Sequence, residues 1–143
     1  MITAIALGES TNLSAEEAAT GLAKISNVMG TMDREGSEGV ERFGATLVEL
    51  GNNGASTESE ILEMAQRIAG AAKTVGASES DVLALSNTLA SMGVRAEQGG
   101  GVATRVILKM SAAVDEGGES LETFAQVAGT SAEEFAAKFR SAP

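Results

Sequence analysis

The sequence contains no cysteine and no histidine. Without these residues the chain has no disulfides, no thiolate nucleophiles and no imidazole bases, and nearly all zinc sites are excluded. Most familiar enzyme mechanisms depend on one of these groups. The composition therefore predicts a protein that is not an enzyme, and no residue emerges as catalytic, cofactor-binding or metal-binding.

Basic and aromatic residues are also scarce. Ten Lys and Arg stand against twenty Asp and Glu, which gives a formal net charge of -10. This is the wrong sign for a surface that must neutralise phosphates, so we expect no direct binding to nucleic acid. The aromatic residues are four Phe, and the core must therefore be built mainly from Ala, Val, Leu, Ile and Met.

Long hydrophobic runs are absent as well. No stretch approaches the roughly 18 consecutive apolar residues that a membrane span requires. The opening residues, MITAIALGEST, lack the basic flank and the long apolar centre of a signal peptide. We expect no membrane span in this segment and a chain that is soluble and intracellular when made. Its 143 residues, 43% of them apolar, match the size and content of one compact domain.

What the sequence does contain is a recurring helix start. A Ser or Thr is followed three residues later by an acid, and then by apolar residues at helical spacing. The hydroxyl can cap free amides of the first turn, while the acid reaches back to the cap amide and favours the positive end of the helix dipole. Four pairs of this kind predict helix starts: Ser14 with Glu17, Thr57 with Glu60, Ser78 with Asp81, and Ser131 with Glu134.

Between these starts the apolar residues keep the period of a helix. Glycines, joined by two asparagines in the first case, end several of the stripes, at residues 51–54, 76, 93 and 117. The pattern predicts an all-α fold: a compact array of six to seven short amphipathic helices joined by Gly-rich turns, with residues 1–143 as a single helical module. The stripes are Leu22, Ile25, Met29 and Met32; Val40, Phe43, Leu47 and Leu50; Ile61, Leu62, Ala65, Ile68, Ala69, Ala72 and Val75; Val82, Leu85, Leu89 and Met92; Val102, Val106, Met110 and Val114; Leu121, Phe124 and Val127; and Phe135 with Phe139.

Two acidic segments resemble the start of a calcium loop because acids stand at alternating positions. Such a loop needs Gly at its sixth position and a bidentate Glu at its twelfth, and neither segment provides them. We interpret the first segment as an exposed polar connection between two helices. Its residues are Asp33, Glu35, Ser37 and Glu41, with Glu38 sixth and Gly44 twelfth, and those of the second segment are Asp115, Gly117 and Glu119.

Three glycines at 99–101 precede a predicted helix that carries Arg105 and Lys109, an arrangement found in some anion sites. A phosphate-binding loop would also need Lys and Ser or Thr directly after its last glycine, where this chain has Val and Ala. We therefore interpret the polar loop 94–101 as a hinge or a close backbone approach. Consecutive acids fit helix caps better than the acid pair of a glycosidase; they are Glu16 with Glu17, and Glu133 with Glu134.

The middle of the chain, residues 50–97, closely resembles the characteristic segment of phage tail tape measure proteins. The resemblance rests on LGNNG, EILEMAQRIAGA, VLALSNTLAS and AGTSAEEFA in this order, and it extends over nearly the whole chain. These motifs carry no catalytic residue to transfer. The resemblance implies a structural component of a phage or prophage tail that acts in tail assembly and tail-length determination and helps DNA to enter the cell.

The same resemblance implies the partners and the location. In that family the tail tube protein polymerises around several copies of the tape measure, which associate inside the tail, while tail assembly chaperones and tail-tip proteins bind it. The expected location is the host bacterial cytoplasm during assembly and the lumen of the virion tail afterwards. Family members are several times longer than 143 residues, so we expect this chain to be a fragment.

A tape measure has to be extended, whereas these residues predict a compact helical body. We therefore hypothesise that the segment is a folded module of the tape measure, with hinges at Gly51, Gly76, Gly93 and Gly117. A different hypothesis is a helical adaptor that docks tail chaperones or the tail-tip initiator complex. A third, a cell-wall hydrolase that works with a Glu alone, finds no supporting motif around any Glu.

Overall fold

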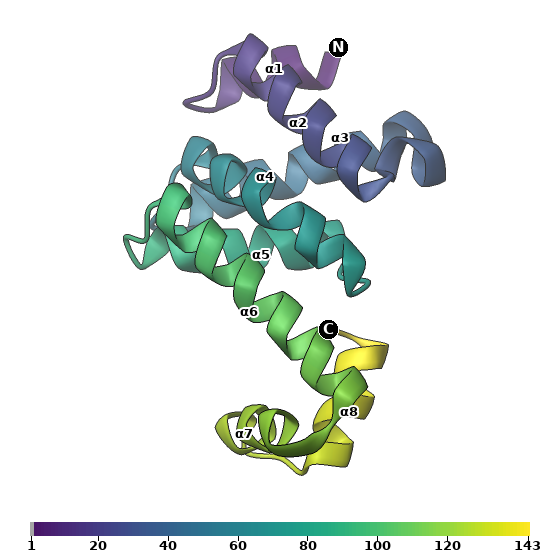
Figure 1. The fold of residues 1–143 in the computed structure, drawn as a ribbon. Helices are drawn as coiled ribbons and strands as arrows, with labels where there is room; N and C mark the ends of the chain where they lie inside the picture. Colours follow the sequence, from purple (N-terminus) through teal and green to yellow (C-terminus); the bar gives the residue numbers. More distant parts are fainter. Residues whose placement is uncertain (1) are drawn as a thin grey trace.

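The computed structural model describes residues 2–143, in which the chain forms eight α-helices and no β-strand. Figure 1 shows α1 to α5 gathered in one body, from which α6 extends to a smaller unit made with α7 and α8. The helices are α1 (Ile2–Ser10), α2 (Ala15–Met29), α3 (Thr31–Asn53), α4 (Glu58–Thr74), α5 (Glu79–Ser91), α6 (Ala96–Glu116), α7 (Gly118–Ala128) and α8 (Ala132–Ser141).

The predicted all-α class is confirmed, but the predicted count of six to seven helices is too low. The missing helix is α1, which has no acid in its first turn and no base in its last turn. No capping pair precedes it in the sequence either. It is held by packing, because Ala4 and Leu7 are buried in the main core. A helix that depends on tertiary contacts in this way leaves little local signal.

The predicted helix starts at Ser14, Thr57 and Ser78 are confirmed as capping boxes. At Ser14, for example, the hydroxyl oxygen accepts from the Glu17 amide at 3.2 Å, and the Ser14 amide donates to the Glu17 carboxylate at 2.9 Å. The fourth start is only half of a box. The Ser131 hydroxyl accepts from the Glu134 amide at 3.1 Å, but the Glu134 carboxylate meets the Lys138 ammonium at 2.7 Å instead.

The polar connection expected at residues 33–41 is confirmed in part. The segment is mostly exposed and lies within the bounds of α3, but two helical parts of α3 meet there at the non-helical Gly36. A separate break at Gly30, whose φ of 75° ends α2, comes before it. Gly36 then kinks α3 with φ 61° and ψ -153°, a conformation that glycine adopts without strain. Met32 therefore leaves the first stripe and is 53% exposed.

Two other glycine segments also differ from their predictions. The helix end expected at residues 51–54 is confirmed, since α3 ends at Asn53, but the cap residue Gly54 is extended with φ -98° rather than left-handed. The loop expected at 94–101 is shorter, because α6 begins at Ala96 and takes in all three glycines. Of the predicted hinges, Gly76, Gly93 and Gly117 adopt positive φ between helices, whereas Gly51 lies inside α3.

The main core is centred on α4, which packs against α2, α3, α5 and α6. Ile61, Met64, Ala65 and Ile68 of α4 have no exposed surface. The neighbouring helices add Leu22 and Ile25 of α2, Phe43 and Leu47 of α3, and Val82 and Leu83 of α5. None of the helices in the described residues is long and apolar enough to cross a membrane.

A second, smaller core joins the end of α6 to α7 and α8. Its buried residues are Ala113, Val114, Leu121 and Ala136. Three of the four Phe side chains pack beside them, with ring centroids 6.2 Å apart for Phe124 and Phe135 and 6.1 Å apart for Phe135 and Phe139. The Arg140 guanidinium also donates to the Val114 carbonyl at 2.7 Å. The expected compact array thus has two separate cores along one chain.

The close approach of α2 to α4 gives a first prediction. A Cβ at Gly21 would lie 2.4 Å from Leu62 Cδ2, whereas a Cβ at Gly70 would meet nothing within 4 Å. Gly70→Ala should stabilise the chain by up to about 1 kcal/mol through helix propensity. Gly21→Ala should destabilise it, because overpacking a buried contact costs about 1–3 kcal/mol. Urea denaturation measures both values, and equal effects of the two substitutions would contradict the close contact.

The capping boxes give a second prediction, on pH. Hydrogen bonds lower the pKa of three cap carboxylates below their ordinary values; the larger cause is the cap hydroxyl for Glu17 and Asp81 and the cap amide for Glu60. Since these pKa values are lower in the folded chain, the caps stabilise it above the ordinary carboxylate pKa of about 4 and lose this effect as the pH falls further. The melting temperature should therefore drop between pH 5 and pH 3, as thermal unfolding monitored by circular dichroism would record.

The matched control separates the caps from the general charge of the chain. A variant with Glu17→Gln, Glu60→Gln and Asp81→Asn should lose less of its melting temperature over this pH range than a variant neutralised at three exposed acids outside the caps. Those three control substitutions are Glu38→Gln, Glu49→Gln and Glu122→Gln. Equal losses in the two variants would refute the contribution of the caps.

Candidate functional site

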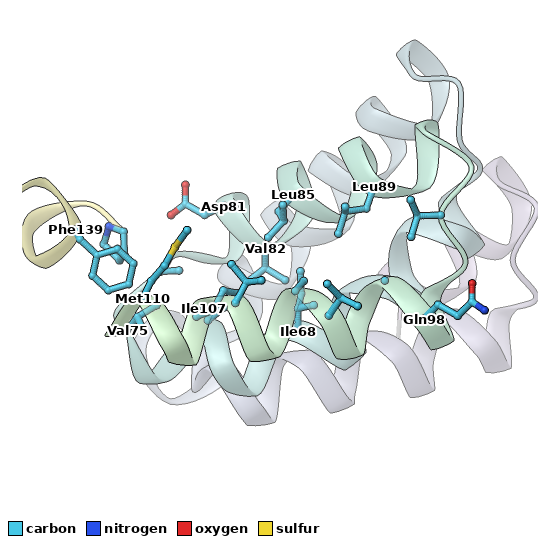
Figure 2. A pocket seen from close by; sticks show the side chains of 18 residues that line it. Ile68, Val75, Asp81, Val82, Leu85, Leu89, Gln98, Ile107, Met110 and Phe139 are labelled. Carbon is cyan, nitrogen blue, oxygen red and sulfur yellow. The ribbon is translucent and has the colours of Figure 1, made fainter. Parts of the chain in front are cut away.

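An apolar groove lies between α5 and α6, with α4 as its floor (Figure 2). Both α5 and α6 pack closely against α4, but they do not pack closely against each other. The space between them has a volume of about 670 Å³. The floor is Ile68, Ala72 and Val75, one wall is Val82, Leu85 and Leu89, and the other is Val102, Val106 and Met110.

This groove is formed by stripes that the sequence predicts as core. The stripe of α5 is buried at Val82, which is 1% exposed, but Leu85 is 37% exposed. The stripe of α6 is buried at Val114, yet Val102 is 51% and Val106 is 39% exposed. The apolar stripes of these two helices are therefore only partly buried. Only one side of each stripe meets α4, and the other side faces the groove.

One end of the groove is closed by Met110 and by Phe139 of the smaller unit, and Gln98 lies at the other end (Figure 2). Asp81 is the single acidic or basic side chain among the lining residues. Its carboxylate accepts from the Ser78 amide at 2.9 Å and from the Ser78 hydroxyl at 2.7 Å. These bonds lower its pKa and hold it as a helix cap. The groove is thus suited to binding apolar side chains rather than to acid-base chemistry.

The acids that resemble a calcium loop do not come together as a site. They lie along the kinked helix α3, where Glu35 forms ion pairs with Arg34 and Arg42. Within residues 2–143 there is no group of three or more acidic side chains placed to hold a metal ion. In the second segment, Gly117 separates α6 from α7, with Asp115 before it and Glu119 after it.

The three glycines tested as an anion site lie in the first turns of α6. Gly99 and Gly100 are buried, since a Cβ at Gly99 would lie 2.4 Å from Val94 Cγ1 and one at Gly100 would lie 2.6 Å from Arg67 Cβ. Close backbone approach is therefore the correct one of the two interpretations for these glycines. Arg105 and Lys109 are exposed farther along α6.

The consecutive acids stand at helix starts, as the sequence predicts. Glu17 belongs to a complete cap, Glu134 pairs with Lys138, and the preceding acids Glu16 and Glu133 are exposed. One acid that the sequence analysis passed over does connect distant elements. Glu79 of α5 accepts from the Thr31 hydroxyl at 2.6 Å and from Arg34 at 2.5 Å. Burial raises the pKa of Glu79, but these hydrogen bonds outweigh it and lower the pKa overall.

An open groove and a sealed core respond differently to a buried charge. Val106→Asp should change the free energy of unfolding by about 1 kcal/mol or less, because the new carboxylate can stay in water. Val82→Asp should cost about 4 kcal/mol or more, because Val82 is buried at the base of the α5 wall and the new charge would be shielded from water. Urea denaturation of both variants measures this. A severe loss of stability for Val106→Asp would mean that the groove is closed in solution.

Comparison with known families is consistent with a structural chain of this kind. A sequence model described as phage-related minor tail protein matches residues 1–143. Searches among curated proteins and among solved structures find no match. Because the match extends over the entire chain, this helical protein with its open groove belongs to the family of phage-related minor tail proteins.

Proposed function

We propose that this chain is a segment of a tape measure protein and acts in tail assembly and tail-length determination. The observation that carries the proposal is the ordered set of motifs in residues 50–97 and near the C-terminal end, inside a chain that belongs throughout to a phage tail family. The absence of His and Cys from the sequence supports a structural role without enzymatic activity.

The architecture supports a folded module within the tape measure. As one continuous helix, 143 residues would extend over about 215 Å. The longest helix without a kink, α6, has 21 residues and a length of about 32 Å. The chain turns back on itself at the helix junctions. Helices that precede α4 in the sequence, α2 and α3, and helices that follow it, α5 and α6, pack around α4 and bury it. In this state the segment contributes to tail length as a folded body rather than as an extended rod.

The proposal includes the surroundings that the resemblance implies. The segment is assembled in the host bacterial cytoplasm, and in the virion it lies in the tail lumen beside further copies of itself. Its partners are the tail tube protein, the tail assembly chaperones and the tail-tip proteins. The acidic composition, with twenty acids against ten bases, suits a body that lies on the path of DNA without binding it.

An in-frame deletion of the segment tests this function in a phage that encodes it. Electron microscopy should find shorter tails, with a shortening well below the roughly 215 Å of a continuous helix. A shortening of about 215 Å would refute the folded state but keep the tape measure role. Tails that are normal in number, length and infectivity would refute the tape measure role itself.

A second candidate function is a helical adaptor that docks a tail chaperone or the tail-tip initiator complex. The groove between α5 and α6 favours it, because Leu85, Val102 and Val106 keep substantial exposure beside a well-packed core. Apolar grooves of this form accept the apolar face of a partner helix. The two roles are compatible, since a tape measure segment has to be recruited before it is enclosed.

A further inference from the structure

The groove has the shape of an unfilled helix position. With α4 as floor and α5 and α6 as separate walls, the three helices occupy three of the four positions of a helix bundle (Figures 1 and 2). The wall of α6 from Gln98 to Met110 is about 18 Å long, which corresponds to just over three turns of a fourth helix. A helix with apolar residues at i, i+3, i+4 and i+7 presents a face of this length.

The charge around the groove is unlike that of the rest of the chain. Residues 82–94 of the α5 wall contain neither acids nor bases, and residues 98–114 of the α6 wall contain no acid. The α6 wall does contain two bases, Arg105 and Lys109. In a chain with twice as many acids as bases, the walls of the groove are therefore free of negative charge beyond the cap residue Asp81 at one end.

The two bases stand where a groove-bound helix would meet them. Lys109 follows Val102 by seven residues, almost two helical turns, so both lie on nearly the same side of α6. Arg105 is one turn before Lys109 and directly precedes Val106. Both are exposed, and neither forms an ion pair with another part of the described chain. They line the outer edge of the α6 wall as unpaired positive charges.

From this arrangement we propose that the groove binds an amphipathic helix of a partner protein, with an apolar face in the groove and acidic residues along the flank that meets Arg105 and Lys109. The inference rests on the adaptor role proposed above and names the chemistry of its partner. At physiological salt charges act over about 8 Å, so the bases at the rim outweigh the distant acids that give the chain its net charge. A second copy of this chain is the competing occupant, and the oligomeric state in solution tests it.

Two synthetic peptides of about 14 residues, roughly four helical turns, serve as probes. Both carry Leu at i, i+3, i+4 and i+7; one has Glu along the flanks and the other has Lys. Fluorescence anisotropy with the 143-residue chain should give about tenfold tighter binding of the Glu peptide. The net charge of -10 alone favours the Lys peptide. Tighter binding of the Lys peptide, equal binding of both, or no binding of either would overturn the proposal.

Charge reversal at the rim tests the role of the two bases. Arg105→Glu with Lys109→Glu should remove the preference for the Glu peptide. The control Lys24→Glu with Lys73→Glu makes the same change in net charge at exposed sites outside the groove lining and should keep the preference. If both double variants change binding equally, long-range charge rather than the rim determines it, and the proposal fails.

Substitution on the two sides of α6 tests the place of binding. Val106→Asp in the groove should abolish binding, while Leu108→Asp, at a residue 46% exposed that does not line the groove, should not. Equal loss in both variants would place binding elsewhere. Light scattering that finds a dimer which Val106→Asp dissociates would assign the groove to a second copy and overturn the proposal.

Failure of this chemistry can be told apart from failure of the adaptor role by placing Val106→Asp in the phage. If the peptides do not bind but the substitution blocks tail assembly, the adaptor role stands and the acidic partner helix is wrong. If the Glu peptide binds the groove but the substitution leaves assembly intact, the partner chemistry holds in solution and the adaptor role is wrong.

Discussion

The fold depends on the burial of α4 from several sides at once. Nine of its seventeen residues are buried, and helices α2, α3, α5 and α6 pack around it. With only four Phe in the sequence, this core is made mainly of small and aliphatic side chains, and the helix axes have to come close. Gly21 and Gly100 permit this approach at Leu62 and Arg67, where a Cβ would overlap the neighbouring side chain. Close helix packing therefore replaces the large aromatic contacts that the composition lacks.

The position of α4 also explains why the groove stays open. The first half of α6 is held on one side by α4, and its second half leaves the main core to form a smaller one with α7 and α8. The side of α6 that faces α5 has no described element to cover it. The apolar stripe of α6 is thus wider than the surface that α4 covers. The part of the stripe that α4 leaves uncovered forms a wall of the groove. Core and groove are parts of the same amphipathic face.

The parts of this structure that sequence predicts well are those fixed by neighbouring residues. A capping box joins a residue to another three positions away, so Ser14, Thr57 and Ser78 identify their helix starts without tertiary information. The failures lie where distant contacts decide. Gly99 and Gly100 are helical because α4 lies against them, although three successive glycines favour a loop. The groove is hidden from sequence for a similar reason: Val82 and Val106 have the same helical spacing, and only the packed chain makes one buried and the other exposed.

The proposed tape measure role depends on length, whereas the segment is a compact helical body. The groove affects how stable this compact body is. Domains of this size are stable by only about 5–15 kcal/mol, so small contributions decide how firmly the segment stays folded. A partner helix that binds the folded groove adds stability to the compact state, by about 2.7 kcal/mol when it is present at a hundred times its dissociation constant. In the proposed tape measure role, a bound partner would therefore strengthen the folded module. The same exposed apolar wall that leaves the core incomplete would then be the place where a partner helix completes it.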